Sequence, residues 1–297
     1  MKMKSKRAAN LILLHFLVFI WGFTGILGYE ISLSPLPLVW WRVFIASAAL
    51  LLFSVVMRKS ISANLREMIY FSGVGVIIAL HWLCFFGSIK ESTISVALVV
   101  ISTTAFFVSL ISPWIRREKF HYYELFLGIL VVLGLAVIFR FESQYTKGII
   151  LSLLSALFAA TFSTLNSLLI VKHTALKIAF WEILSACLAL TAFLAFRGDI
   201  PEVVTNIGQY DLMLLLILGI VCTGFAFVAG IEVMKVLSPF TCALAINLEP
   251  VYTILLALLF YGENEYMSPQ FYLGAVIILS TLFIEAFMKR KQIAEQA

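Results

Sequence analysis

Residues 243–259 read ALAINLEPVYTILLALL, a mostly apolar stretch that contains Asn247, Glu249 and Pro250. In helical form it comes close to the thickness of the hydrocarbon core of a membrane. A buried carboxylate is costly unless it is paired, and a proline displaces the carbonyl group four residues earlier, here that of Ile246. The stretch therefore predicts a membrane-spanning helix with polar groups or water beside Glu249.

The composition extends this interpretation to the whole chain of 297 residues. Hydrophobic residues make up 62% and charged residues 12%, and the mean hydropathy is +1.05. These values lie far outside those of soluble domains, so we predict an all-α integral membrane protein. Ten apolar runs are long enough to cross a bilayer, at residues 10–28, 36–57, 68–89, 93–115, 122–139, 148–170, 176–196, 211–234, 239–260 and 269–288.

The basic residues predict the orientation of these spans, because cytoplasmic loops carry the excess of Lys and Arg. With the N-terminus inside, sixteen basic residues fall in inner segments and four in outer loops, and Arg42 lies within the second span. We expect both termini in the cytoplasm and the protein in the cytoplasmic (inner) membrane. The net charge of +5 reflects this topology and indicates no nucleic-acid partner.

Two pairs of segments indicate an internal repeat. ALVVISTTAFF from Ala97 aligns with ALAINLEPVYT from Ala243, and VWWRVFI around Arg42 aligns with IAFWEIL around Glu182. Five spans then lie in residues 1–142 and five in residues 143–297. Because five is odd, the second half enters the membrane from the opposite side. We therefore expect ten transmembrane helices, arranged as two inverted five-helix repeats around a central cavity.

Several short motifs follow one another in a fixed order: Trp21-Gly22, Pro37 with Trp41-Arg42, SVALVVIS at 95–102 and LEPVYTILLALLFYGE at 248–263. In this order and spacing the chain resembles the EamA-type family of drug and metabolite transporters over nearly its whole length. The resemblance implies a ten-helix bundle of two inverted halves, a central substrate cavity and alternating access.

We expect the substrate site near the middle of the membrane, where several spans converge. Aromatic rings there would stack on a small amphipathic molecule and a few polar groups would orient it. The predicted substrate-binding residues are Trp21, His81, Trp82, Thr103, Phe106, Phe162, Ser163, Asn166, Glu249 and Tyr252.

Three features of this site allow two interpretations each. Glu249 is either a proton-coupling carboxylate or a protonated group that braces neighbouring helices, because ionisable residues inside membranes are often functional. The stripe of small and polar residues from Ser152 to Asn166 suits either a cavity wall or close helix packing. His81 either contacts substrate or bonds to a neighbouring helix.

Arg42 and Glu182 occupy matching places in the two halves. Inverted symmetry puts them towards opposite ends of the bundle, too far apart to pair. We expect each to act as a gate, an interfacial anchor or a charge at the substrate entrance.

The remaining residues narrow the class of protein. Phosphorylated substrates need converging cations, and Arg42 is the single deeply placed one, so a small neutral or zwitterionic, amino-acid-like metabolite is favoured. No catalytic or metal-binding constellation is evident, the four cysteines lie inside spans, and we expect neither an enzyme nor a cofactor. A passive channel for small polar solutes is the alternative to a carrier that exports its substrate, with protons as the candidate coupling ion. No oligomer is required.

Overall fold

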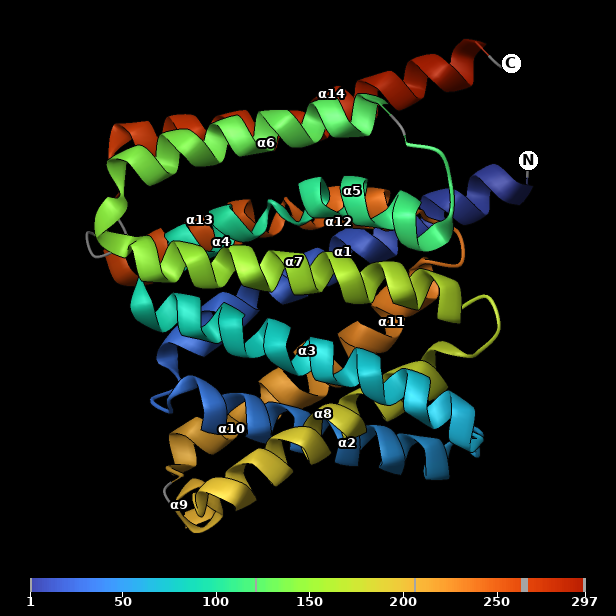
Figure 1. Ribbon diagram of the computed structural model, residues 1–297, viewed down its shortest axis with the longest axis vertical. Coiled ribbons are helices and arrows are strands. Elements are labelled where there is room, and N and C mark those ends of the chain that lie inside the picture. Colours follow the sequence, from blue (N-terminus) through green and yellow to red (C-terminus); the bar gives the residue numbers. More distant parts are fainter. Residues whose placement is uncertain (1, 121, 206, 263–266, 296–297) are drawn as a thin grey trace.

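The computed structural model describes residues 2–120, 122–205, 207–262 and 267–295, and these residues form helices and no strand (Figure 1). The helices are α1 (Lys2–Glu30), α2 (Pro35–Val56), α3 (Leu65–Glu91), α4 (Ile94–Ile101), α5 (Thr104–Arg116), α6 (Tyr122–Phe141), η1 (Ser143–Tyr145), α7 (Thr146–Leu169), α8 (Ala175–Arg197), α9 (Ile200–Thr205), α10 (Gln209–Gly219), η2 (Ile220–Phe225), α11 (Ala226–Val233), α12 (Pro239–Ile246), α13 (Glu249–Tyr261) and α14 (Pro269–Glu295).

Long apolar helices dominate this arrangement. In the described part of the chain, seven segments are long and apolar enough to cross a membrane: Lys6–Glu30, Pro35–Val56, Leu65–Glu91, Ile94–Arg116, Ser143–Leu169, Ala175–Arg197 and Gln209–Val233. The other three predicted spans coincide with α6, with α14 and with α12 followed by α13. The protein is therefore a multi-pass membrane protein.

Two of the predicted spans are interrupted in the middle. The stretch 93–115 is divided into α4 and α5 at Ser102 and Thr103, and 239–260 is divided into α12 and α13 at Asn247 and Leu248. At the first break the Oγ1 of Thr103 donates to the carbonyl oxygen of Val100 at 2.8 Å, a local bond that competes with the helical pattern. At the second break Pro250 lies in the first turn of α13, where a helix does not use the missing N–H.

A third irregularity lies between α10 and α11. Here η2 forms a π-helical turn, and the Oγ1 of Thr223 donates to the carbonyl oxygen of Leu218 at 2.8 Å. Gly219 just before it lets α2 approach closely, because a methyl group at 219 would lie 2.7 Å from the Cγ2 of Ile45. Single π-turns inside helices are common at functional sites.

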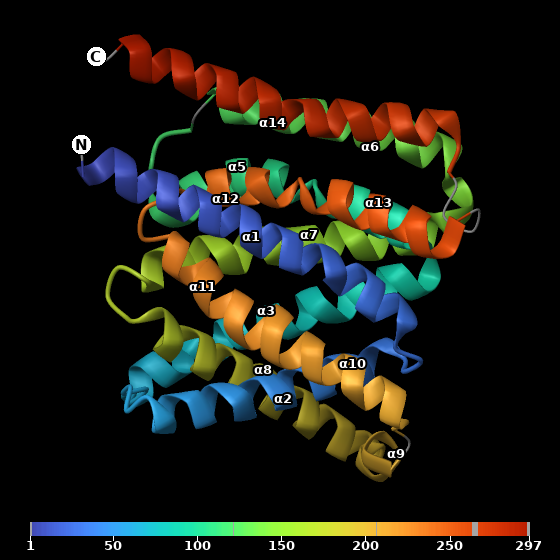
Figure 2. The same ribbon diagram turned by 180° about the vertical axis from the view of Figure 1, so that it is seen from behind.

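The helices pack side by side, with α6 and α14 together at one edge of the bundle (Figures 1 and 2). They cross at Gly134 and Gly274, where the two backbones are in contact. Near the middle α4 packs against α13 and α5 against α12, while α3 packs against α7 and α8. The start of α1 and the end of α14 lie at the same end of the bundle.

Candidate functional site

A cavity of about 140 Å³ lies inside the bundle. This space is several times what one water molecule needs. Its walls come from α1, α2, α3, the α4–α5 break, α7, η2, α11, α12 and the first residue of α13. Helices α6, α8, α9, α10 and α14 contribute no lining residue among those described.

Arg42 brings a positive charge to this cavity. Its side chain is 3% exposed, and its Nε donates to the Oγ1 of Thr223 at 2.6 Å. The guanidinium carbon lies 4.2 Å from the centre of the Trp82 ring, a cation–π contact. Thr223 belongs to the π-turn, so the irregular backbone there helps to position the Arg42 side chain. The Nη1 atom is buried and has no hydrogen-bond partner in the described part of the chain.

Glu249 brings a carboxyl group to the same cavity. It is 8% exposed and lies at the start of α13, beside Ile246 of α12. Its carboxylate interacts electrostatically with Arg42, but no ion pair joins the two in the described residues. A guanidinium group and a carboxyl group therefore face one small space without direct contact.

Aromatic side chains fill much of the remaining wall. The His81 ring lies 5.3 Å from that of Phe162 and 6.3 Å from that of Phe85, and Phe227 contacts both Trp82 and Phe162. Such rings give a large apolar contact surface with a few polar edges. The cavity thus combines a mainly apolar wall with one guanidinium group and one carboxyl group.

The polar stripe of α7 divides between the two roles that the sequence allowed. Ser152 donates to the carbonyl oxygen of Ala97 at 2.7 Å, and Ser155 lies 2.8 Å from the Nδ1 of His81, so this part packs against neighbouring helices. The part nearer the end of α7 faces the cavity with Ala159, Phe162, Ser163 and Asn166.

Most of the predicted binding residues line the cavity, namely Trp21, His81, Trp82, Phe162, Ser163, Asn166 and Glu249. Three do not. Thr103 is buried and bonds to its own helical turn, Phe106 packs against α6 at Gly128, and Tyr252 packs edge-on against Phe19. Thr104, next to Thr103, lines the cavity instead. Binding by any of these residues stays a prediction.

Arg42 and Glu182 lie elsewhere than expected. Neither is an interfacial anchor, because their side chains are 3% and 0% exposed. The second span therefore contributes to the cavity, which sequence reasoning missed, as it missed Phe227 and Cys222. The position of Arg42 within an apolar span could have indicated a place at the cavity, because charged residues inside membranes usually face the interior of the bundle or a water-filled cavity.

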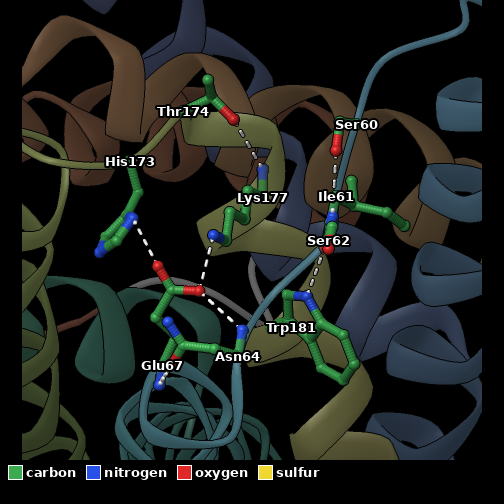
Figure 3. A network of polar contacts seen from close by, with 9 residues as sticks. All are labelled: Ser60, Ile61, Ser62, Asn64, Glu67, His173, Thr174, Lys177 and Trp181. Carbon is green, nitrogen blue, oxygen red and sulfur yellow. Dashed lines mark hydrogen bonds and ion pairs between the residues drawn. The ribbon is translucent and has the colours of Figure 1, made fainter.

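The carboxylate of Glu67 at the start of α3 joins several segments at one end of the bundle (Figure 3). It lies 2.8 Å from the Nζ of Lys177 and 3.5 Å from the Nδ1 of His173, and it accepts from the backbone N–H of Asn64. These contacts join the loop between α2 and α3 to the loop between α7 and α8 and to the start of α8. Trp181 adds a bond to the carbonyl oxygen of Ile61 at 2.7 Å.

A similar set of contacts lies at the opposite end of α2, in the loop between α1 and α2. Asp211 at the start of α10 accepts from the backbone N–H of Ser32 at 3.0 Å and from its hydroxyl group. Lys90 at the end of α3 donates to the carbonyl oxygen of Ile31 at 2.7 Å. At each of these two ends of the bundle one carboxylate thus joins neighbouring loops and helix ends.

Comparisons with known proteins agree with this architecture. The EamA-like transporter family matches the chain twice, at residues 9–140 and 146–286. An uncharacterized transporter of Archaeoglobus fulgidus is 23% identical over 267 residues, which cover 85% of this chain and 88% of that protein. The uncharacterized transporter YxxF of Bacillus subtilis is 24% identical over 223 residues, covering 72% and 68%. A protein of known crystal structure superposes with a TM-score of 0.70 at 15% identity, covering 95% of this chain and 98% of that one, a likeness of fold.

Proposed function

The chain belongs to the EamA-like transporter family, and from this premise we propose that it exports a small zwitterionic or neutral, amino-acid-like metabolite across the cytoplasmic membrane by alternating access. As a member of that family it is a membrane transporter. The substrate class, the direction and the mechanism are the proposal.

The observation that carries the substrate class is the pair of opposite charges in one cavity. Arg42 keeps an unpartnered Nη1 within the described residues, and Glu249 faces the same space without an ion pair to it. A zwitterion places a carboxylate at the guanidinium and an ammonium at Glu249, so that both buried charges gain a partner. The aromatic wall then receives an apolar side chain.

Thermal-shift measurements on the purified protein test this assignment, because a ligand of the native state raises its melting temperature. L-Phenylalanine is compared with phenethylamine, which lacks the carboxylate, and 3-phenylpropionate, which lacks the ammonium; smaller L-amino acids complete the series. We expect stabilisation by one or more of the amino acids and none by the singly charged analogues. Equal stabilisation by a singly charged analogue contradicts the two-charge site.

The transport mechanism is separable from the substrate class. A carrier that encloses its substrate catalyses saturable counterflow in liposomes, whereas an open channel for small polar solutes does not. The contacts of Glu67 and Asp211, one at each end of the bundle, are of the kind that can form and break alternately, which supports the carrier. Absence of counterflow with a ligand that raises the melting temperature would favour the channel.

We also propose ten transmembrane helices in two inverted repeats, residues 1–142 and 143–297, with both termini cytoplasmic. Support comes from the two successive family matches and from the reciprocal packing of α4 on α13 and α5 on α12. Single cysteines at Ser62 and Thr205, both exposed, should react with a membrane-impermeant reagent from opposite sides. Labelling of both from one side contradicts this topology.

Glu249 is the proposed coupling residue. A carboxyl group in a cavity that opens alternately to each side can take up a proton from one side and release it to the other. The alternative, a protonated brace between helices, predicts that the isosteric Gln preserves the response of transport to a pH gradient.

A further inference from the structure

A second carboxyl group lies one helix behind the cavity wall. Glu182 of α8 is 0% exposed, and it accepts a hydrogen bond of 3.1 Å from the Nδ2 of Asn166 on α7. Asn166 is itself buried against the protein and lines the cavity. The bond therefore connects a titratable group to a residue of the cavity wall.

This bond leaves one acceptor on each residue without a partner in the described part of the chain, Oε1 of Glu182 and Oδ1 of Asn166. Buried polar atoms in proteins are nearly always hydrogen-bonded, and leaving one unsatisfied is destabilising. A single proton on Oε1, donated to the Oδ1 of the amide to which the carboxyl group is already bonded, would satisfy both atoms.

No cation takes the place of this proton. In the described residues Glu182 has no ion pair, and the titratable groups on the elements around α8 are engaged elsewhere or lie at the surface. They are Glu67 with Lys177 and His173, His81 with Ser155, Lys90 with Ile31, Arg42 with Thr223, Glu232 with Lys235, Lys147 with Glu91, Arg197 with Asp199, and the exposed Arg66, Tyr70 and Glu202.

Close packing seals the side of α8 that faces α3. A methyl group at Gly75 would collide with the carbonyl oxygen of Glu182, and the hydroxyl groups of Ser72 and Ser185 lie 2.9 Å apart across the same contact. A proton therefore reaches the pair from the side of Asn166, where the cavity is.

We propose that Glu182 and Asn166 form a proton-binding acid–amide pair in the cavity wall. A primary ammonium group has three N–H donors, so that a substrate ammonium bound at Glu249 has a further N–H that competes with the Glu182 proton for the Oδ1 of Asn166. When the proton leaves, the carboxyl O–H bond breaks and a cavity water molecule accepts the proton as hydronium. Competition between proton and substrate for one acceptor is a basis for exchanging one for the other. This consequence for coupling rests on the transport function proposed above, whereas protonation of the pair does not.

Infrared difference spectroscopy of the full-length protein in detergent tests protonation without any substrate. We expect a carbonyl band of a protonated carboxyl group at neutral pH that is absent in Glu182→Gln and moves to higher frequency in Asn166→Ala, which removes the acceptor. Glu182→Gln retains both hydrogen bonds of the pair and should keep the melting temperature, so the loss of the band is not a folding defect. If no band at neutral pH disappears in Glu182→Gln, the pair does not hold a proton.

The competition is tested with methylammonium chloride as the probe and tetramethylammonium chloride as the control of equal charge without N–H donors. We expect methylammonium to reduce the Glu182 band and tetramethylammonium to leave it unchanged. Equal responses, or no response to methylammonium, overturn the competition. Because neither salt needs to be transported, failure of the proposed export leaves these results standing.

Discussion

The two helix breaks near the middle of the bundle look alike in backbone and differ in chemistry. At the α4–α5 break the Oγ1 of Thr103 satisfies the carbonyl oxygen of its own turn, and no charge is present. At the α12–α13 break Glu249 faces the cavity. The Asn247 amide, in the orientation that satisfies both of its ends, donates to the carbonyl oxygen of Ser102 at 3.1 Å. The second break is thus supported by the first.

This difference teaches that a broken helix is not by itself a functional site. Both breaks leave backbone groups that local or neighbouring groups must satisfy, but only the second adds an ionisable side chain to the cavity. We therefore assign a structural role to the first break and a chemical role to the second. The following experiments test this division.

The largest effect is expected from Glu249→Gln. Proteoliposomes under an imposed pH gradient should lose proton-driven accumulation and reach only the level seen without a gradient, while binding and exchange persist. Thr103→Val at the matching position of the first break is the control and should keep the gradient response. An unchanged response in Glu249→Gln removes this residue from coupling, and a lost response in Thr103→Val removes the distinction between the breaks.

Removal of the opposite charge should weaken binding. Truncating one partner of a buried charged contact costs 2 kcal/mol or more, so Arg42→Gln should raise the dissociation constant of the stabilising amino acid about 30-fold or more. Calorimetry on the purified protein measures this change. In double-mutant cycles Arg42→Gln should be non-additive with Glu249→Gln and additive within about 0.5 kcal/mol with Thr103→Val. Additivity with both shows that Arg42 and Glu249 do not share a ligand.

The attachment of the second break to α1 should contribute to stability. The Oγ1 of Thr253 donates to the carbonyl oxygen of Gly22 at 2.7 Å, across two helices that are far apart in sequence. Thr253→Val should lower the free energy of unfolding by about 1 kcal/mol. Thr104→Val removes a bond within its own turn, to Ile101 at 2.7 Å, and should cost less. Denaturant titrations of the two variants compare the breaks, and a larger loss for Thr104→Val reverses their order.

The smallest effect is expected from Pro250→Ala. The α4–α5 break forms without a proline, and Pro250 lies in the first turn of α13, where a missing N–H is tolerated. We expect the melting temperature to change little, corresponding to less than about 0.5 kcal/mol. A stabilisation approaching the roughly 3 kcal/mol typical of a proline inside a helix would show that Pro250 causes the break.

Much of the helical arrangement follows from the sequence, because a bilayer admits few alternatives to apolar helices. The predicted spans all coincide with single helices or with two or three successive ones. The breaks and the π-turn were not predictable in the same way. Ser102 and Thr103 are compatible with a helix as well as with a turn. The need for glycine at 219 follows from the close approach of Ile45 on another helix, which the local sequence does not show.

The cavity was predictable in part. His81, Trp82 and Asn166 stood out as polar or aromatic residues on faces shared with small residues. Arg42 was assigned to the end of the bundle because its depth was counted along the chain, whereas depth depends on helix tilt and on the partner that accepts the charge. Asn166 and Glu182 lie on successive helices, and their pairing follows from side-chain geometry that the sequence pattern does not contain.

The crossing of α6 and α14 has a consequence for how the sequence can evolve. A methyl group at Gly134 would lie 2.7 Å from the carbonyl oxygen of Gly274, and one at Gly274 would lie 2.6 Å from that of Gly134. Each glycine thus excludes a side chain at the other position. On the proposed division α6 belongs to the first half and α14 to the second. On that division, a substitution at either glycine of this crossing changes the packing of the other half as well.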